Sequence, residues 1–336
     1  MSQLTQDYTN MIRDVGCLLD GNSEWIPRYK GYATAINGKS SLIKQASLRF
    51  GSTPNLDIYL PTSKAKQANS RTVFFDVRYK GQSVGELLIR DHGVSIRFHT
   101  DKNNTCYSAY PKKLFDIPDN GEKDWLSQEA ILFRKFFASA PSRKKGKYFE
   151  HDFESQLLNQ FSKKTSNGKY LRNIQPIRLL GKNFQMPTPI TASRAKDGAM
   201  DYSKHNGGGI DILVRQGIGN GVCLTVIELK DECVAHEPPE RAIMQAIAYA
   251  TFLQKLLRTP EADSVGWWSF FGFNGSIPKR LKIRAVIAMP RGDYFDTSFA
   301  MEKLDIPNSS DCLELHYLYF NADTNITGIA ETSLKG

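Results

Sequence analysis

VCLTVIELKD, residues 222–231, is the stretch on which the fold of the second half of the chain depends. Its first six residues are mainly β-branched or aliphatic, as in a buried strand. Successive side chains of a strand point to opposite faces, so Glu228 and Lys230 share one face while Leu229 points into the core on the other. The pattern therefore predicts a carboxylate and an ammonium side by side where a buried strand ends.

A second short strand is predicted just upstream, over Gly209 to Val214, with Asp211 as its one charged residue. The segment between the strands, RQGIGNG, has the composition of a hairpin turn. Strands joined by a hairpin are antiparallel neighbours, so Asp211 can approach Glu228. Two carboxylates offer the oxygen ligands that Mg²⁺ prefers, and bound Mg²⁺ activates water and offsets charge on a phosphate. With Lys230 beside them, these residues predict phosphodiester hydrolysis.

The two predicted strands resemble the motif of the PD-(D/E)xK nuclease superfamily, which has the restriction-endonuclease-like fold. Gly-Ile-Asp211, a gap of 16 residues and then Glu228-Leu229-Lys230 carry the resemblance. Ile210 precedes Asp211 at a position where the superfamily often has proline. The resemblance implies Mg²⁺ or Mn²⁺ bound by Asp211, Glu228 and the Leu229 carbonyl. It also implies that Lys230 orients or activates the attacking water.

A helix predicted over Glu240 to Leu257 extends the resemblance. Gln245 and Tyr249 lie four residues apart, and therefore on one helical face. They are similar to the Q-x-x-x-Y motif of the RecB-like branch of the superfamily. This similarity implies that they position Lys230 or the substrate backbone.

The superfamily pattern also includes a glutamate on a helix before the first strand. The helix predicted over Tyr148 to Phe161 offers Glu150 and Glu154, one turn apart. We favour Glu154 as the residue that supports the metal, because it directly precedes the best amphipathic turn, and keep Glu150 in reserve.

The chain has 44 Lys and Arg against 35 Asp and Glu, a net charge of +9, which is consistent with a polyanionic partner. Basic residues flank the predicted glutamate helix, and we predict nucleic-acid contacts from Arg143, Lys144, Lys145, Lys147, Lys163 and Lys164. A solvated surface or linker is the alternative for residues 143–147. A second basic group, Lys279, Arg280, Lys282 and Arg284, opens a later predicted strand. The resemblance makes DNA the expected partner rather than RNA.

Residues 148–336 are predicted to form the nuclease-like domain, a mixed sheet flanked by helices. Its further strands are predicted over Asn173 to Gly181, Leu281 to Met289 and Cys312 to Phe320. The strand after the helix over residues 240–257 is expected to be reached by a right-handed crossover. The aromatic run from Trp267 to Phe273 is interpreted as core rather than as a base-stacking surface.

Residues 1–140 are predicted to form a separate, mainly antiparallel β-rich domain, joined by a basic linker over residues 141–147. Alternation of apolar and polar residues predicts its strands, over Ser41 to Phe50, Thr72 to Tyr79, Ser83 to Arg90 and Val94 to Thr100. A helix is predicted from Glu122 to Ala138. Substrate recognition, partner binding and homodimerisation remain open as roles of this domain.

Other features exclude several classes of protein. No apolar run approaches the roughly 20 residues that span a bilayer, and the amino terminus lacks a basic-then-apolar signal, so we expect a cytoplasmic protein without a membrane partner. The five cysteines are scattered and predict neither a disulfide framework nor a zinc site.

Two alternatives to a constitutive nuclease stay open. The chain could be a defence or mobile-element effector nuclease that a partner or ligand activates. It could instead be a catalytically inactive module that binds nucleic acid within an assembly. A surface ion pair is the structural alternative for Glu228 and Lys230.

Overall fold

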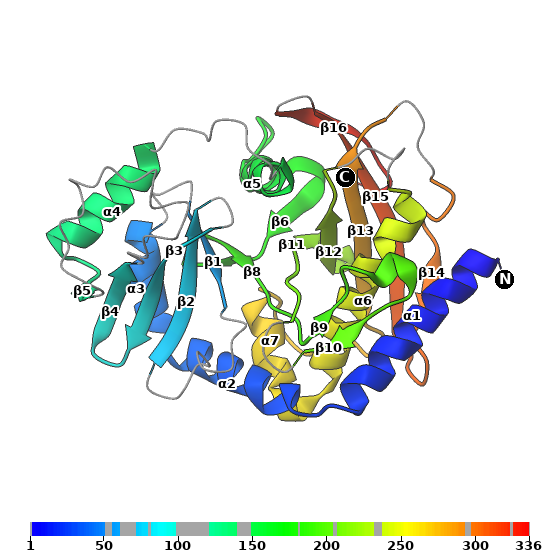
Figure 1. Ribbon diagram of the computed structural model, residues 1–336, viewed down its shortest axis with the longest axis horizontal. Coiled ribbons are helices and arrows are strands. Elements are labelled where there is room, and N and C mark those ends of the chain that lie inside the picture. The colour runs from blue at the N-terminus through cyan, green and yellow to red at the C-terminus, as the bar shows by residue number, and fades with distance from the viewer. Residues whose placement is uncertain are drawn as a thin grey trace. The chain divides into compact units, whose positions relative to one another are not determined.

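The computed structural model describes residues 2–50, 56–60, 72–79, 82–98, 121–139, 149–180, 182–203, 207–231, 237–292, 297–322 and 325–335. The chain forms two compact units, whose elements are labelled in Figure 1. The first contains residues 1–30, 148–177 and 186–336, and the second contains residues 31–147 and 178–185. Within the described residues each unit has a seven-stranded mixed sheet, and the chain has seven α-helices. The predicted α+β class is therefore confirmed.

The sheet of the first unit has the order β14-β15-β13-β12-β11-β6, and β16 also pairs with β15. Its strands are β6 (Ile174–Pro176), β11 (Ile212–Gln216), β12 (Cys223–Leu229), β13 (Lys282–Pro290), β14 (Lys303–Asp305), β15 (Cys312–Ala322) and β16 (Ile326–Thr332). β11 and β12 form the predicted antiparallel hairpin, in which Ile212 pairs with Ile227. β12 pairs with β13, and β13 with β15, in parallel. The expected mixed sheet is therefore present, with two strands, β14 and β16, that the sequence pattern did not indicate.

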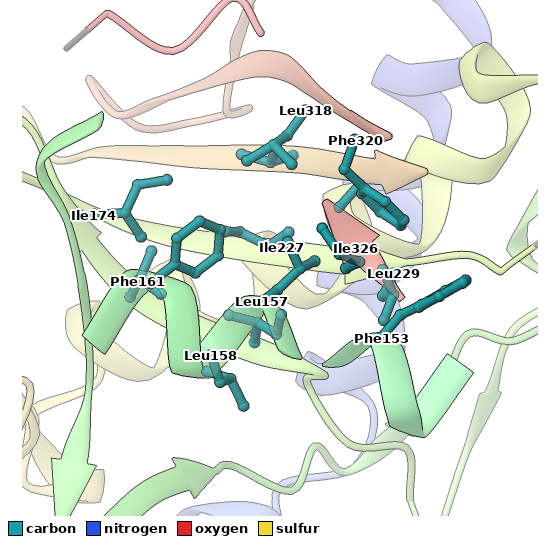
Figure 2. Close-up of a cluster of buried hydrophobic side chains, with 14 of the residues drawn as sticks. Phe153, Leu157, Leu158, Phe161, Ile174, Ile227, Leu229, Leu318, Phe320 and Ile326 are labelled. Atoms are coloured by element: carbon teal, nitrogen blue, oxygen red, sulfur yellow. The ribbon is translucent and has the colours of Figure 1, made fainter. Parts of the chain in front are cut away.

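Helix α5 (Phe149–Ser162) covers one face of this sheet. Phe153, Leu157 and Phe161 pack there against the side chains that alternate along the strands (Figure 2). These strand residues are Ile212, Val214, Ile227, Leu229, Val286, Ala288, Leu318 and Phe320. The predicted orientation of Leu229 into the core is therefore confirmed.

Helix α6 (Pro239–Arg258) connects β12 to β13 and contacts both strands as well as β15. Strand side chains that point away from α5, such as Val226 and Ile287, are also fully buried. After α6 comes α7 (Ser264–Phe270), where Trp267 and Trp268 are buried. The aromatic run thus contributes to the core, as predicted.

The small strands β9 (Ile190–Thr191) and β10 (Asp201–Tyr202) form a separate antiparallel pair.

Helix α1 (Gln3–Asp20) belongs to the first unit and was not predicted. Its buried residues follow helical spacing and comprise Tyr8, Met11, Ile12, Val15 and Leu19. It packs on α6, where the Tyr8 hydroxyl donates to the Glu240 carbonyl at 2.7 Å. The observed division therefore differs from the predicted boundaries, because residues 1–30 join the first unit and residues 178–185 join the second.

The second unit has the sheet order β5-β4-β3-β2-β1-β8-β7, in which only the β1–β8 pair is parallel among the described strands. The strands are β1 (Leu56–Tyr59), β2 (Thr72–Tyr79), β3 (Gln82–Arg90), β4 (Gly93–Phe98), β5 (Glu122–Asp124), β7 (Arg178–Leu179) and β8 (Lys182–Gln185). Three predicted strands are confirmed as β2, β3 and β4, as is the mainly antiparallel character of this sheet.

Two predictions for this region were wrong. The strand expected over Ser41 to Phe50 is helix α3 (Ser40–Phe50), because its buried residues Ile43 and Ala46 follow helical rather than alternating spacing. The helix expected from Glu122 begins later, as α4 (Gln128–Ser139), because residues 122–124 pair with β4. Helix α2 (Trp25–Gly38) was not predicted.

No helix in the described part of the chain is long and apolar enough to cross a membrane.

Candidate metal-binding active site

Three carboxylates meet at one end of the first unit's sheet. Glu150, Asp211 and Glu228 place carboxylate oxygens that all lie within 4.8 Å of one another. Asp211 directly precedes β11 and Glu228 is the last residue but one of β12, so the hairpin register sets them opposite each other. Glu150 lies in the first turn of α5. Three elements from different parts of the sequence therefore build this carboxylate cluster.

Backbone hydrogen bonds hold the strand ends that carry these groups. The Leu229 amide donates to Asp211 Oδ2 at 3.0 Å, which ties the first carboxylate to the strand of the second. The Lys230 amide donates to the Ala288 carbonyl of β13 at 2.9 Å. Because this bond extends the pairing of β12 with β13, Lys230 has a defined position one residue beyond the strand.

The Lys230 ammonium connects the carboxylate cluster to α6. Its Nζ donates to Glu228 Oε1 at 3.1 Å and to Gln245 Oε1 at 3.2 Å, and it lies 3.9 Å from Glu150 Oε1. Gln245 Nε2 donates in turn to the Tyr249 hydroxyl at 3.5 Å. The residues predicted from the strand motif and from the helix motif are thus brought together in one hydrogen-bonded group.

The charges of this group are not balanced. Glu228 is only 1% exposed, and its buried Oε2 has no hydrogen-bond partner among the described residues. Burial, and then the Asp211 charge, raise the pKa of Glu228 well above its usual range, although Lys230 opposes this. Burial lowers the pKa of Lys230, but the charges of Glu228 and the two other carboxylates outweigh burial and raise it.

When all three carboxylates are ionised, as a bound cation favours, they exceed the Lys230 ammonium by two negative charges, the charge of one divalent cation. All three ligands are hard oxygens, and one of them is a buried oxygen without a donor. A donor set of this kind suits Mg²⁺ or Mn²⁺. The residues therefore fit the metal that the sequence motif implies.

Glu150, rather than Glu154, belongs to the carboxylate cluster. The two residues are one turn apart on α5, and Glu154 is buried among the turns that pack on the sheet. The geometry thus favours the reserve residue over the one preferred from sequence. Amphipathicity identifies the helical turns that face a core, and it therefore pointed to Glu154. The carboxylate cluster is instead reached by the first turn of α5, which carries Glu150.

Two of the six predicted nucleic-acid contacts lie within the described residues, and both are away from the site. Lys163 and Lys164 are exposed just beyond the end of α5. They are 13 and 14 residues from Glu150, which corresponds to about 20 Å along a helix. The other four, Arg143, Lys144, Lys145 and Lys147, lie outside the described residues.

Gly208 packs against Tyr249 of the site, and the sequence did not predict this contact. A Cβ at this position would lie 2.2 Å from the Tyr249 hydroxyl oxygen, so only glycine fits without displacement. The Gly208 amide donates to the Ile190 carbonyl at 2.8 Å, which fixes this close approach. Three consecutive glycines at 207–209 signal close backbone packing, but not against which residue.

Comparisons with protein-family models, with curated proteins and with solved structures find no match for this chain. What the fold and the site define by themselves is an α+β protein with a partly buried carboxylate–lysine cluster at the ends of two antiparallel strands.

Proposed function

We propose that the chain is a metal-dependent nuclease that hydrolyses phosphodiester bonds, with DNA as its substrate. The observation that carries the proposal is the group of three carboxylates within 4.8 Å of one another, with Lys230 hydrogen-bonded to the buried Glu228. The motif resemblance to PD-(D/E)xK nucleases supports the same chemistry.

Asp211, Glu228 and Glu150 are the residues that would hold Mg²⁺ or Mn²⁺, and the resemblance adds the Leu229 carbonyl. The metal would supply a Lewis acid for the phosphate and a bound water of lowered pKa. The Leu229 amide keeps the Asp211 carboxylate oriented towards Glu228. Burial of Glu228 keeps its carboxylate away from competing water, which strengthens its electrostatic interactions.

Lys230 is the residue that would act on the attacking water or on the phosphate. Two of its three N–H groups are directed to Glu228 and Gln245, which leaves one for a water or a phosphate oxygen. Gln245 and Tyr249 are positioning residues in this scheme, because they reach the reaction only through Lys230.

Cleavage of circular and linear DNA in Mg²⁺, Mn²⁺ or EDTA tests the proposal. We expect cutting that requires metal, and a loss of at least about 100-fold in Glu228→Gln and in Lys230→Ala, since each removes a group that acts on the reacting atoms. Glu261→Gln is the matched control, because this glutamate is exposed and lies outside the site.

Thermal unfolding of each variant separates a loss of chemistry from a loss of fold. Cutting that persists in both site variants would refute the assignment of the site. DNA binding by the wild type without any cutting would favour the inactive module or the partner-activated effector.

A further inference from the structure

A second charged cluster lies on the same sheet, away from the carboxylates. Glu314 of β15 is surrounded by Lys282 and Arg284 of β13, each at 3.3 Å, and by Lys303 of β14 at 3.7 Å. The strand register pairs Arg284 with Glu314, and Glu314 with Lys303, so these three side chains form a row across three strands. We call Lys282, Arg284, Lys303 and Glu314 the basic cluster.

Positive charge exceeds negative charge in the basic cluster. Its three permanent cations share one carboxylate, which leaves two positive charges without a counter-ion in the cluster. Glu314 is 10% exposed, whereas Lys303 is 64% and Lys282 35% exposed. The carboxylate is therefore enclosed, while two of the ammonium groups remain accessible to a ligand.

Glu314 stays ionised and offsets one of the three positive charges. His316, then Lys282 and Arg284, hold the pKa of Glu314 at about 2, against the effect of burial. At 3.9 Å His316 Nε2 is an electrostatic neighbour of the carboxylate rather than a hydrogen-bond partner. At neutral pH the three cations and the ionised Glu314 therefore leave the cluster with two excess positive charges.

His316 adds a second, independent observation. Its ring is almost fully buried, and Nε2 has no hydrogen-bond partner among the described residues. Nδ1 lies 2.9 Å from Ser333 Oγ, which already accepts the Tyr317 amide and so has its own proton to donate to Nδ1. This assignment leaves the ring proton on the buried Nε2, which faces the Glu314 carboxylate of the cluster.

The basic cluster lies at the opposite end of the strands from the carboxylates. Glu228 of β12 pairs with Ile287 of β13. Lys282 is five residues before Ile287 on β13, which corresponds to about 17 Å along the strand. Lys282 and Arg284 lie on the same face of β13 as Val286 and Ala288, because these positions are two residues apart, and this is the face that α5 covers. Exposed Lys279 and Arg280 directly precede this strand.

We propose that the basic cluster is a second nucleic-acid contact, which binds backbone phosphates about 17 Å from the carboxylate site. The inference rests on the proposed function, since it concerns how the same substrate is held. Lys303 lies on the edge strand β14, and Lys282 opens β13 with a partly exposed side chain, so the cluster is open to solvent. An open cluster of this kind suits an extended polyanion better than a small ligand. A span of about 17 Å corresponds to about five base pairs, so a longer duplex has phosphates within reach of both clusters.

Binding of a labelled duplex of about 20 base pairs to full-length Glu228→Gln protein tests this, with affinity measured by fluorescence anisotropy over a series of salt concentrations. Introducing Lys282→Gln and Lys303→Gln together into this protein should weaken binding at least about tenfold. It should also reduce the magnitude of the slope of log K against log salt by about 2, since each phosphate contact contributes about 0.9. Lys255→Gln is the matched control, because Lys255 is also a partly exposed lysine paired with a carboxylate, that of Asp20. It should leave affinity and slope unchanged.

The outcomes separate the two proposals. An unchanged salt slope and affinity in the double variant, or no binding by the parent protein at low salt, would overturn the second contact, whatever the result for cleavage. Binding that depends on Lys282 and Lys303, in a wild-type protein that never cuts, would support the contact and refute a constitutive nuclease. Equal thermal unfolding of parent and double variant would show that the change is local.

Discussion

Glu228 and Asp311 are buried carboxylates in the same unit, each only 1% exposed, with opposite environments. Asp311 accepts hydrogen bonds from Gln254, from two nitrogens of Arg258 and from the Leu281 amide. These bonds bring the pKa of Asp311 down to about 2, although burial alone would raise it. Glu228 has an unpartnered oxygen and a raised pKa. A satisfied carboxylate stabilises the fold, whereas an unsatisfied one is suited to binding a cation.

Asp311→Asn should lower the free energy of unfolding by about 3 kcal/mol, because it leaves Arg258 and Gln254 facing an amide instead of a carboxylate. In the wild type the pKa of about 2 compares with an ordinary 3.8. The associated stability, about 2 kcal/mol, is therefore complete above pH 3.8 and is lost as pH falls towards 2. Denaturant unfolding between pH 6 and about 2 checks both points. Equal pH dependence in variant and wild type would contradict this account.

At the scale of single elements, α5 connects the core to the carboxylate cluster. Phe153, Leu157 and Phe161 pack it onto the sheet (Figure 2). Its first turn carries Glu150 to the strand ends. The side chains of Phe153 and Phe320 meet edge to face, with ring centroids 5.4 Å apart. The position of Glu150 therefore depends on the packing of the whole helix.

Substitutions one turn apart on α5 should have different effects. Glu150→Gln should weaken Mn²⁺ binding at least about tenfold and leave the melting temperature nearly unchanged, because Glu150 is a metal ligand in the proposed site. Glu154→Gln should lower the melting temperature and keep Mn²⁺ affinity, because Glu154 is buried outside the carboxylate cluster. Calorimetric Mn²⁺ titration and thermal unfolding measure the two effects. The reverse pattern would restore Glu154 as the metal-supporting residue.

At the scale of the whole molecule, the first unit is assembled from distant parts of the chain. Residues 1–30 precede the second unit in sequence and yet belong to the first. The five buried residues of α1 contribute on the order of 10 kcal/mol of hydrophobic stabilisation as an upper estimate. That is comparable to the net stability of a typical domain, about 5–15 kcal/mol.

A fragment of residues 148–336 should therefore fail to fold cooperatively, although the sequence pattern marks it as a domain. In the full chain, Val15→Asp should destabilise the first unit by more than about 3 kcal/mol, because it buries an unpaired charge against α6. Asp14→Asn, on the exposed side of α1, is the control. Circular dichroism melting of fragment and variants checks this. A cooperative fragment melt at the wild-type temperature would show that α1 is dispensable.

Short-range patterns were sufficient for the strands that carry or adjoin Asp211, Glu228 and Lys230, and for the helix that carries Gln245 and Tyr249. Strand alternation set Glu228 and Lys230 on one face, a hairpin brought Asp211 beside Glu228, and helical spacing aligned Gln245 with Tyr249. Each of these relations joins residues that are close in sequence or related by one turn or hairpin, so local geometry determines them.

The tertiary structure alone decided which glutamate of α5 joins the carboxylates, that Gly208 packs against Tyr249, and that α1 completes the first unit. It also brought Lys303 and Glu314 together with the Lys282 and Arg284 that open β13. These contacts join segments far apart in sequence, and their geometry depends on how helices and strands pack. Hydrophobic periodicity shows which face of an element is buried, but it carries no information about which distant element covers that face.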